Sequence, residues 1–499
     1  MTVIKRQTIL GTLFSYLGVI VGTLTQAIIF PKYLSTEEVG LFAMIFNWTL
    51  ILVFIATLGF NSSGTRFFEK FRNEEKKHNG YLFSGMIFLL VGSILVFILM
   101  LLFKNYIISS SKGDTQLFEK YFFLILPLTI SLGVFNIFDN YAKGLYETVV
   151  GNFLNQFLQR FLVFLAVIFY ILDLYNFKTF VFVWAISLAI PTLIMYFYCR
   201  ALGGFSLLPN NFLLKASFLK EFNQFAAFSI LTGLSSIVIT KIDSLLVYEY
   251  LGLGQIGIYN FCLLFGSVMT ISYNVNLKAS TAIVLDALSK NDIPKINQIF
   301  IKSSQTQTLF GVALLLVVWL NIDSFFEFIK PEYAAGKYVI LIIGISKIFD
   351  LASGINSLIM VYSKYYKLDS VLVISFVGLL FLLNHFFIPK YGLNGAAIAA
   401  LIATFYYNIM RNMLIWKYFK IHPYSISLIK IVGIGIIIYF LISTFPNFRN
   451  NLMLTFFTMV YKSGIAIFIF IASIYIFKIN EEVNQMLNNI FKRIISFLK

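Results

Sequence analysis

The chain has 499 residues, of which 59% are hydrophobic and only 12% are charged, and its mean hydropathy is +0.86. Soluble domains are roughly half apolar and about a quarter charged. These values therefore exclude a soluble globular protein and indicate an integral membrane protein. The formal net charge of +16 is explained by the charge bias of membrane-protein loops and by attraction to anionic lipid, so it does not require a nucleic-acid partner.

Apolar runs of about 20 residues, long enough to cross a bilayer core of about 30 Å, recur along the whole chain. Fourteen membrane-spanning helices are predicted, near residues 8–31, 39–62, 81–103, 119–142, 150–171, 179–199, 222–248, 256–285, 303–321, 338–362, 369–388, 394–416, 425–445 and 452–477. The first run is too long for the apolar region of a signal peptide, and no small-residue cleavage site follows it. We therefore expect the first helix to remain in the protein.

Lysines and arginines are distributed unevenly between the loops of the two sides. With an even number of spans both termini lie on one side, and the loops of that side hold 23 basic residues while the other side holds nine. The positive-inside rule therefore predicts cytoplasmic termini. Six further basic residues lie within or near spans, where a charge is costly: Arg160, Lys241, Lys278, Lys347, Lys430 and Lys462.

The sequence contains an internal repeat. Three segment pairs recur at offsets of 217, 211 and 216 residues: 31–42 with 248–259, 137–139 with 348–350, and 175–178 with 391–394. They indicate a duplicated six-helix unit, and an even number of spans makes both copies point the same way. The expected fold is an all-α integral membrane protein with two six-helix bundles related by a parallel repeat, plus two extra C-terminal helices.

Five regions follow from this repeat: an N-terminal six-helix bundle (1–200), a cytoplasmic connector (201–221), a C-terminal six-helix bundle (222–420), transmembrane helices 13 and 14 (421–478) and a cytoplasmic amphipathic tail (479–499). Connectors stay short, and the longest, such as 286–302, run to about 20 residues. No catalytic loop is visible, and the two cysteines and three histidines are too scattered to form a metal site. We expect a transporter rather than an enzyme, with its substrate cavity between the bundles.

The expected helix 150–171 begins with a polar stripe. At about 100° per residue, five side chains fall in one arc about 140° wide: Asn152, Asn155, Gln156, Gln159 and Arg160. The stripe stops near mid-membrane at the arginine. A polar face that ends in a fixed charge is expected for one wall of a water-filled, inward-open cavity. Hydrogen bonding between helices is the alternative explanation.

Two other expected helices carry comparable faces. Helix 256–285 presents Ser267, Thr270, Asn274, Lys278 and Thr281, and helix 8–31 presents Gly11, Ser15, Gly18, Gly22, Thr25 and Gln26, for which close helix packing is an equal alternative. The inferred cavity is basic, with Arg160 and Lys278 inside and Arg66 near its cytoplasmic mouth. Such a cavity suits a multivalent anion, for example a diphosphate.

Three further charged residues are candidates for ion coupling or gating: Asp243, Lys347 and Asp350. Asp243 is expected to share a face with Thr232, Ser235, Ser236 and Thr240. Lys347 and Asp350 are three residues apart and are expected to neutralise each other as a structural pair. We expect Lys241 to extend to the periplasmic surface.

Three segments carry a resemblance to a known family: IIFPKYLSTEEVGLF at 28–42, LGFNSSGTRFF at 58–68 and KIDSLLVYEYLGLGQIGIY at 241–259. With spans in a 6+6+2 order, the chain resembles the polysaccharide-transporter flippases. These are the O-antigen (Wzx-type) and capsule flippases of the multidrug/oligosaccharidyl-lipid/polysaccharide exporter superfamily.

The resemblance implies movement of an undecaprenyl-diphosphate-linked oligosaccharide, a repeat unit of O-antigen (lipopolysaccharide) or capsule, across the bacterial inner membrane by alternating access. It also implies a cationic central cavity, here Arg160, Lys278 and Arg66, that binds the diphosphate. Lipid II flippases are rich in arginine on the first helix, whereas this one has none beyond Arg6, which counts against lipid II as cargo. Implied partners are the lipid-linked glycan, membrane lipid, a glycan polymerase and other assembly proteins.

No cofactor is expected, and coupling to a Na⁺ gradient, an H⁺ gradient or the membrane potential stays open. The alternative function is a cation-coupled multidrug exporter of the same superfamily, which needs acidic cavity residues such as Asp243. A polymerase or ligase of lipid-linked glycans is disfavoured because a large periplasmic loop is missing.

Overall fold

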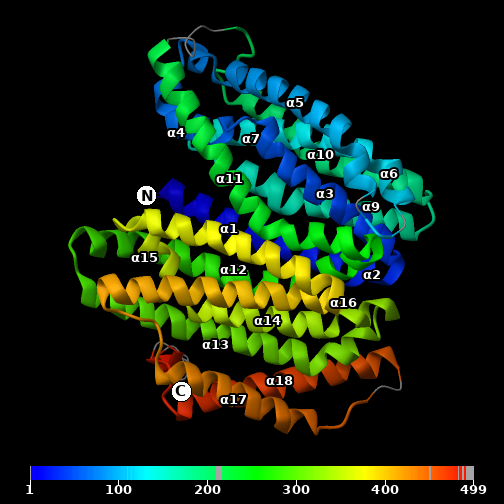
Figure 1. Ribbon diagram of the computed structural model, residues 1–499, viewed down its shortest axis with the longest axis vertical. Coiled ribbons are helices and arrows are strands. Elements are labelled where there is room, and N and C mark those ends of the chain that lie inside the picture. Colours follow the sequence, from blue (N-terminus) through cyan, green and yellow to red (C-terminus); the bar gives the residue numbers. More distant parts are fainter. Residues whose placement is uncertain are drawn as a thin grey trace. The chain divides into compact units, whose positions relative to one another are not determined.

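The computed structural model describes residues 2–109, 111–113, 115–209, 216–448, 451–481, 483–485 and 488–489. Every regular element in these ranges is helical, and no strand occurs among them (Figure 1). The chain is thus an all-α multi-pass membrane protein, which confirms the predicted fold class. Packing divides it into unit 1, Met1–Gly257, and unit 2, Ile258–Lys499. The five regions proposed from the sequence stay a prediction.

Unit 1 contains the elements α1 (Thr2–Leu24), η1 (Thr25–Ile29), α2 (Phe30–Tyr33), α3 (Thr36–Ala56), α4 (Phe60–Phe71), η2 (Lys77–Gly80), α5 (Tyr81–Ser109), α6 (Gln116–Tyr121), η3 (Phe122–Leu124), α7 (Ile125–Gly144), α8 (Val149–Asn152), η4 (Phe153–Leu158), α9 (Gln159–Ile171), α10 (Phe177–Ala201) and α11 (Ala216–Leu251). Its core includes rings from several helices, such as Phe42 of α3 against Trp184 of α10, with centroids 4.7 Å apart.

The start and end of α3 follow from local chemistry. Ser35 accepts a hydrogen bond from the Glu38 backbone N–H while the Glu38 side chain accepts one from the Ser35 N–H, a reciprocal cap that begins the helix. The chain then breaks at Leu58 and Gly59, both with positive φ. A Cβ at Gly59 would lie 2.3 Å from the Ala226 carbonyl oxygen, so only glycine fits there.

The segment after this break differs from the expectation. Residues 60–71 form α4, with its phenylalanines buried and its charged residues exposed. Arg66, Lys70, Arg72, Lys76 and Lys77 are among the 23 basic residues that were counted above for the loops, and two of them, Arg66 and Lys70, lie in this helix. An alternation of buried Phe67, Phe68 and Phe71 with exposed Arg66 and Lys70 has the helical period and explains the element.

Unit 2 contains most of α12 (Leu253–Ser289), followed by α13 (Ile293–Phe326), η5 (Pro331–Gly336), α14 (Lys337–Ala352), α15 (Asn356–Tyr362), α16 (Tyr366–Phe419), α17 (Ile426–Ser443) and α18 (Leu452–Ile476). Only residues 290–292 separate α12 from α13. The stretch 286–302, expected between two spans, is therefore mostly helical, because α12 and α13 continue beyond their apolar parts and meet at a three-residue turn.

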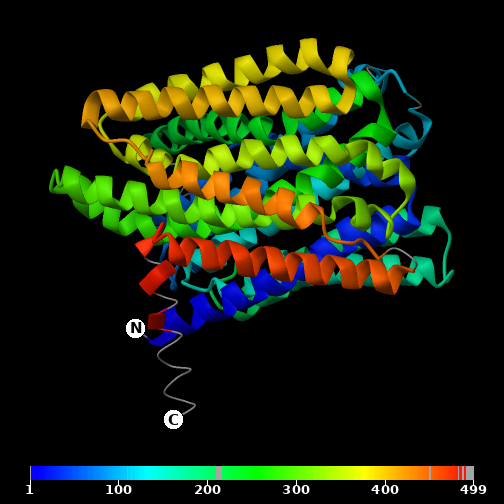
Figure 2. The same cartoon turned by 90° about the horizontal axis from the view of Figure 1, so that it is seen from below.

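Two breaks shape unit 2. Gly392 has non-helical dihedrals, φ 59° and ψ −138°, and divides α16 into two arms that run side by side (Figures 1 and 2). Tyr406 of the second arm donates a hydrogen bond to Ser375 of the first arm at 3.1 Å. The second break, at Gly354 with φ +53°, separates α14 from α15, and the axis there bends by 53°.

The described helices account for most of the fourteen predicted spans. Eleven helices of the described ranges are long and apolar enough to cross a membrane, or twelve if the bent pair before and after Gly354 counts as one span. α16 is counted as one span in this number although it contains two arms. The number does not include α11, which has 36 residues at the place expected for the seventh span.

The last two helices of unit 2 pack on α13. Val312 and Leu316 of α13 form one apolar cluster with Ile438 of α17 and Phe470 of α18. Figure 2 shows α17 and α18, in orange and red, along one side of this unit. They lie at the residues predicted for helices 13 and 14, and the six-plus-six repeat that precedes them stays a prediction.

Candidate functional site

The polar stripe of unit 1 lies on one helix, Val149–Ile171, formed by α8, η4 and α9 and called the stripe helix below. It packs along α1, where glycines allow close approach. A Cβ at Gly18 would lie 1.8 Å from the Gln156 carbonyl oxygen, and one at Gly11 would lie 3.4 Å from Asn152 Nδ2. Close helix packing, one of the two explanations for the small residues of α1, is therefore confirmed at Gly18.

Arg160 continues this contact line. A Cβ at Gly22 would lie 2.9 Å from Arg160 Cδ and 3.4 Å from its Nε, so the arginine side chain lies directly over this glycine. Arg160 is half-buried and forms no ion pair within the described part of the chain. A membrane-embedded cation that is not neutralised by a neighbour is a functional-site candidate, because its burial is costly.

The other stripe residues lie on the same segment. Asn155, Gln156 and Gln159 are half-buried, and Gln26 is exposed in η1.

Both η1 and η4 are π-turns: Phe30 N–H donates to the Thr25 carbonyl and Gln159 N–H to the Leu154 carbonyl, five residues back in each case. The prediction from helical periodicity used ideal α-helices and therefore missed both π-turns, which occur often at functional sites.

Arg66 lies on the exposed side of α4. Its guanidinium stands over the rings of Phe225, at 4.3 Å, and Phe67, at 5.6 Å. Such stacking fixes the side chain while leaving its donors open to water or a ligand. The predicted place of Arg66 at a cavity mouth stays a prediction.

In unit 2, the candidate residues Asn274 and Lys278 are both exposed on α12. They are four residues apart and therefore share a face. Lys278, like Arg160, forms no ion pair with any residue that the structure describes.

The opposite side of α12 is fixed by three polar contacts. Ser272 donates to Gln307 Oε1 at 3.2 Å, Tyr273 and Ser357 share a hydrogen bond of 3.3 Å, and Ser303 donates to Asn276 Oδ1 at 2.7 Å. These contacts fix the rotation of the helix about its axis. The face with Asn274 and Lys278 is thereby turned away from the interior of unit 2.

Lys347 and Asp350 form the expected structural pair, with Nζ 3.8 Å from Oδ2. The Lys347 side chain lies near Gly266 of α12, where a Cβ would be 3.5 Å from its Cγ. Asp350 also accepts a hydrogen bond from Asn408 Nδ2 at 3.1 Å. Their role in ion coupling or gating stays a prediction.

A buried ion pair escaped the sequence analysis. Arg411 donates from Nε to Asp369 Oδ1 at 2.7 Å and from Nη2 to Oδ2 at 3.0 Å, and each side chain is only 7% exposed. Arg411 is one of the 23 basic residues that were counted above for the loops on the side of the termini, and this assignment is wrong because its side chain is buried against Asp369. The partners are 42 residues apart on the two arms of α16, so no local pattern of the sequence reveals them.

Amides extend this pair into a network. Asn356, the first residue of α15, donates to Asn408 Oδ1 at 3.0 Å and to Asn412 Oδ1 at 3.3 Å, and accepts from Arg411 Nη1 at 3.4 Å. We call Asn356, Asp369, Asn408, Arg411 and Asn412 the Asn356 cluster. The cluster provides hydrogen-bond partners for polar side chains beside the break at Gly354. Non-helical backbone inside a membrane is tolerated only where it is buried in protein or lines a water-filled cavity.

The remaining charged candidates have separate places. Asp243 and Lys241 are half-buried in α11, and the side chains of Thr232, Ser235 and Ser236 lie outside the described residues. Lys462 of α18 is buried and donates a hydrogen bond to Asn447 Oδ1 at 2.7 Å, so this lysine has a polar partner in the segment before α18.

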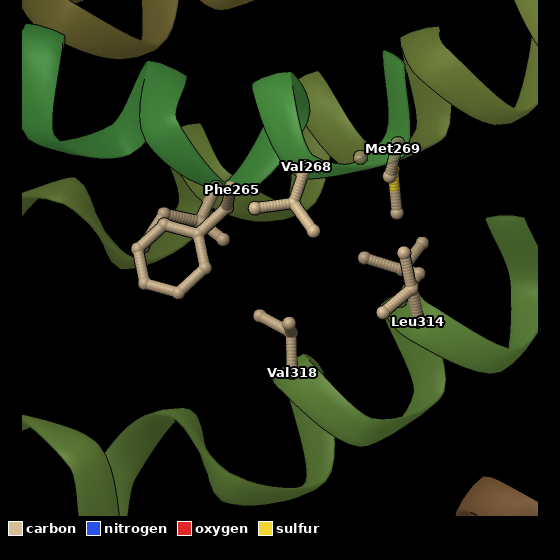
Figure 3. Close-up of a pocket in the computed structure, with 8 residues that line it drawn as sticks. Phe265, Val268, Met269, Leu314 and Val318 are labelled. Atoms are coloured by element: carbon tan, nitrogen blue, oxygen red, sulfur yellow. The ribbon is translucent and has the colours of Figure 1, made fainter. Parts of the chain in front are cut away.

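A pocket in unit 2 lies between α12, α13 and α14 and contains none of the predicted site residues. Figure 3 shows Phe265, Val268 and Met269 on one side and Leu314 and Val318 on the other. All its lining residues are apolar, so the pocket offers no group that could recognise a phosphate. Within the described ranges, no group of three or more His, Cys, Asp or Glu residues could hold a metal ion.

Solved structures with a similar fold include two kinds of transporter. The structure "Lipid II flippase MurJ, inward closed conformation" has a TM-score of 0.72 and 17% identity, covering 93% of this chain and 99% of that chain. An inward-facing multidrug resistance MATE family transporter of the MOP superfamily has a TM-score of 0.61 and 16% identity, covering 85% and 96%. At these identities the likeness shows the fold alone.

A third similar structure is a MOP superfamily transporter from Pyrococcus furiosus, with a TM-score of 0.51 and 15% identity, covering 83% of this chain and 94% of that chain. A search of curated proteins found no match. A family model described as "Polysaccharide biosynthesis protein" matches residues 5–284, which is more than half of the chain and includes both Arg160 and Lys278. The resemblance seen in the sequence motifs is thereby confirmed: the chain belongs to the polysaccharide biosynthesis protein family.

Proposed function

We propose that this protein is a flippase for a lipid-linked oligosaccharide. Its cargo is an undecaprenyl-diphosphate-linked repeat unit of O-antigen or capsule, which it moves from the cytoplasmic to the periplasmic leaflet of the bacterial inner membrane. Transport follows alternating access through a cationic central cavity. Family membership and the fold shared with a lipid II flippase and MATE transporters support this proposal.

The observation that carries the proposal is the pair of unneutralised cations, one in each unit. Arg160 lies over Gly22 beside a polar stripe, and Lys278 lies on an exposed face with Asn274. By contrast, the buried Arg411 has a carboxylate partner. Cations left without a protein anion at membrane depth are suited to a diphosphate, since charge-assisted hydrogen bonds to phosphate are strong.

The two basic groups differ in what they offer an anion. A guanidinium is planar and can donate two parallel hydrogen bonds to a phosphate, whereas an ammonium acts as a compact point charge. We therefore assign Arg160 the directional contact and Lys278 a contribution to the potential. The low-dielectric walls of a membrane protein strengthen the electrostatic attraction between these two cations and a diphosphate.

Surface-glycan export by cells that carry Arg160→Ala tests the assignment. We expect export to be abolished while the protein still reaches the membrane, and Arg160→Lys to keep part of it. The matched control is Lys290→Ala, which removes an exposed lysine paired with Asp286 and should leave export unchanged. Normal export by Arg160→Ala would refute the site.

The alternative is a cation-coupled exporter of cationic compounds, favoured by Asp243 in α11 and by the fold of MATE transporters. It predicts that Asp243→Asn lowers cellular resistance to cationic drugs and that Arg160→Ala does not. Under the flippase proposal, neither variant changes drug resistance. The two functions are thus separated by the same pair of variants.

A further inference from the structure

The π-turn of the stripe helix changes the direction in which Arg160 points. η4 covers Phe153–Leu158, and its signature is the Gln159 N–H that bonds the Leu154 carbonyl, five residues back instead of four. A π-turn therefore accommodates one residue more than an α-turn. Each residue after the π-turn therefore has the angular position around the axis that the preceding residue in the sequence would have in an uninterrupted α-helix.

This extra residue has a calculable effect on the polar stripe. In a plain α-helix Arg160 follows Asn152 by eight residues and lies about 80° away from it around the axis. With one residue absorbed by the π-turn, the angle is that of seven residues, about −20°. The turn thus returns Arg160 to the line on which Asn152 lies.

Gly11, Gly18 and Gly22 lie along one side of α1, which is called the glycine line below. Gly18 follows Gly11 by seven residues and Gly22 follows it by eleven, so all three fall within about 40° of one another on an α-helix. Their neighbours on the stripe helix are, in the same order, Asn152, the Gln156 backbone and Arg160. Without the π-turn, the arginine would diverge from this contact line by about a quarter of a turn.

We propose that the extra residue in 153–158 sets the angular position of Arg160, so that its guanidinium extends along Gly22 toward the bound diphosphate. This inference rests on the proposed function, because it gives Arg160 the anion. The residues of η4 are positioning residues in this account. Arg160 is the group that touches the substrate.

The proposal predicts opposite effects of shortening and lengthening η4. Deleting Leu158 removes the extra residue, converts the turn to α-helix and leaves the arginine on the glycine line, so glycan export should stay within about threefold of the wild type. Inserting one alanine after Leu158 rotates Arg160 by about 100°. Export should then fall about tenfold or more, because a charge-assisted hydrogen bond to the phosphate is lost.

A rescue variant separates orientation from damage to the helix. In the insertion background, Gln159→Arg combined with Arg160→Gln moves the arginine one residue back and returns it to the glycine line, so export should recover. Fluorescence-detected size-exclusion chromatography of all variants reports their amount and folding. If the deletion variant does not reach the membrane, the insertion and its rescue still decide the matter.

Each outcome has one meaning. Equal loss in the deletion and insertion variants, or an insertion that the exchange does not rescue, overturns the π-turn inference while Arg160→Ala remains inactive and the proposed function stands. Wild-type export by the insertion variant also overturns it. Normal export by Arg160→Ala, measured alongside, overturns the proposed site and the inference that rests on it.

Discussion

At the scale of single residues, contact distance decides what α1 can tolerate. Gly18 has no room for a side chain, because a Cβ would meet the Gln156 carbonyl oxygen at 1.8 Å. Backbone atoms cannot rotate away as the end of a flexible side chain can. Gly22 is less restricted, since its nearest neighbour is the flexible arginine side chain. The two glycines should therefore differ in their response to substitution.

Gly18→Ala should separate α1 from the stripe helix and lower stability by about 1–3 kcal/mol, the usual cost of overpacking. Thermal melting of the purified protein in detergent measures this loss. The control is Gly433→Ala in α17, where a Cβ meets nothing within 4 Å, and where alanine should be neutral or raise stability by up to about 1 kcal/mol. Equal melting temperatures for the two variants would contradict the close contact.

At the scale of elements, the Asn356 cluster explains how unit 2 contains a broken span. α15 begins at Asn356, directly after the break, and this residue bonds Asn408, Arg411 and Asn412 of α16. Asp369 at the start of α16 neutralises Arg411. The cluster therefore joins α15 and both arms of α16 through side chains. Through Ser357, the next residue, α15 also contacts Tyr273 of α12, the helix that presents Lys278.

Asp369→Ala should destabilise the protein by about 3–5 kcal/mol, because it leaves the Arg411 charge buried and uncompensated. The double variant Asp369→Leu, Arg411→Met removes both charges and should recover most of the stability. Asp286→Ala, which breaks an exposed pair with Lys290, serves as the control and should not change the melting temperature. A single variant that melts like the wild type would show that the pair contributes nothing to the fold.

At the scale of the whole molecule, hydropathy sufficed to predict an all-α multi-pass membrane protein, of whose fourteen predicted spans eleven or twelve are found among the described helices by length and composition. This succeeded because a lipid interior demands long apolar helices. The exposed position of Lys278 with Asn274 also agrees with a simple helical period. Periodicity fails where the backbone departs from the α-helix, as in the π-turn before Arg160.

Other features were hidden because they depend on distant partners. The residues FLNQFL in η4 have no signature that distinguishes a π-turn from an α-turn. The pairing of Asp369 with Arg411 requires the reversal at Gly392, which places two arms of one helical segment side by side. The α4 helix was missed because its short amphipathic pattern directly follows an apolar span, with no run of polar or turn-forming residues to mark where the span ends.

The central claim is that the molecule moves a lipid-linked diphosphate by means of its two unneutralised cations. The most direct measurement is translocation of a fluorescent undecaprenyl-diphosphate oligosaccharide across the bilayer of proteoliposomes. It compares the wild type with the double variant Arg160→Ala, Lys278→Ala and with Lys290→Ala. The account predicts translocation by the wild type and by Lys290→Ala, and none above protein-free vesicles by the double variant. Equal translocation by all three proteins, or none by the wild type, would contradict it.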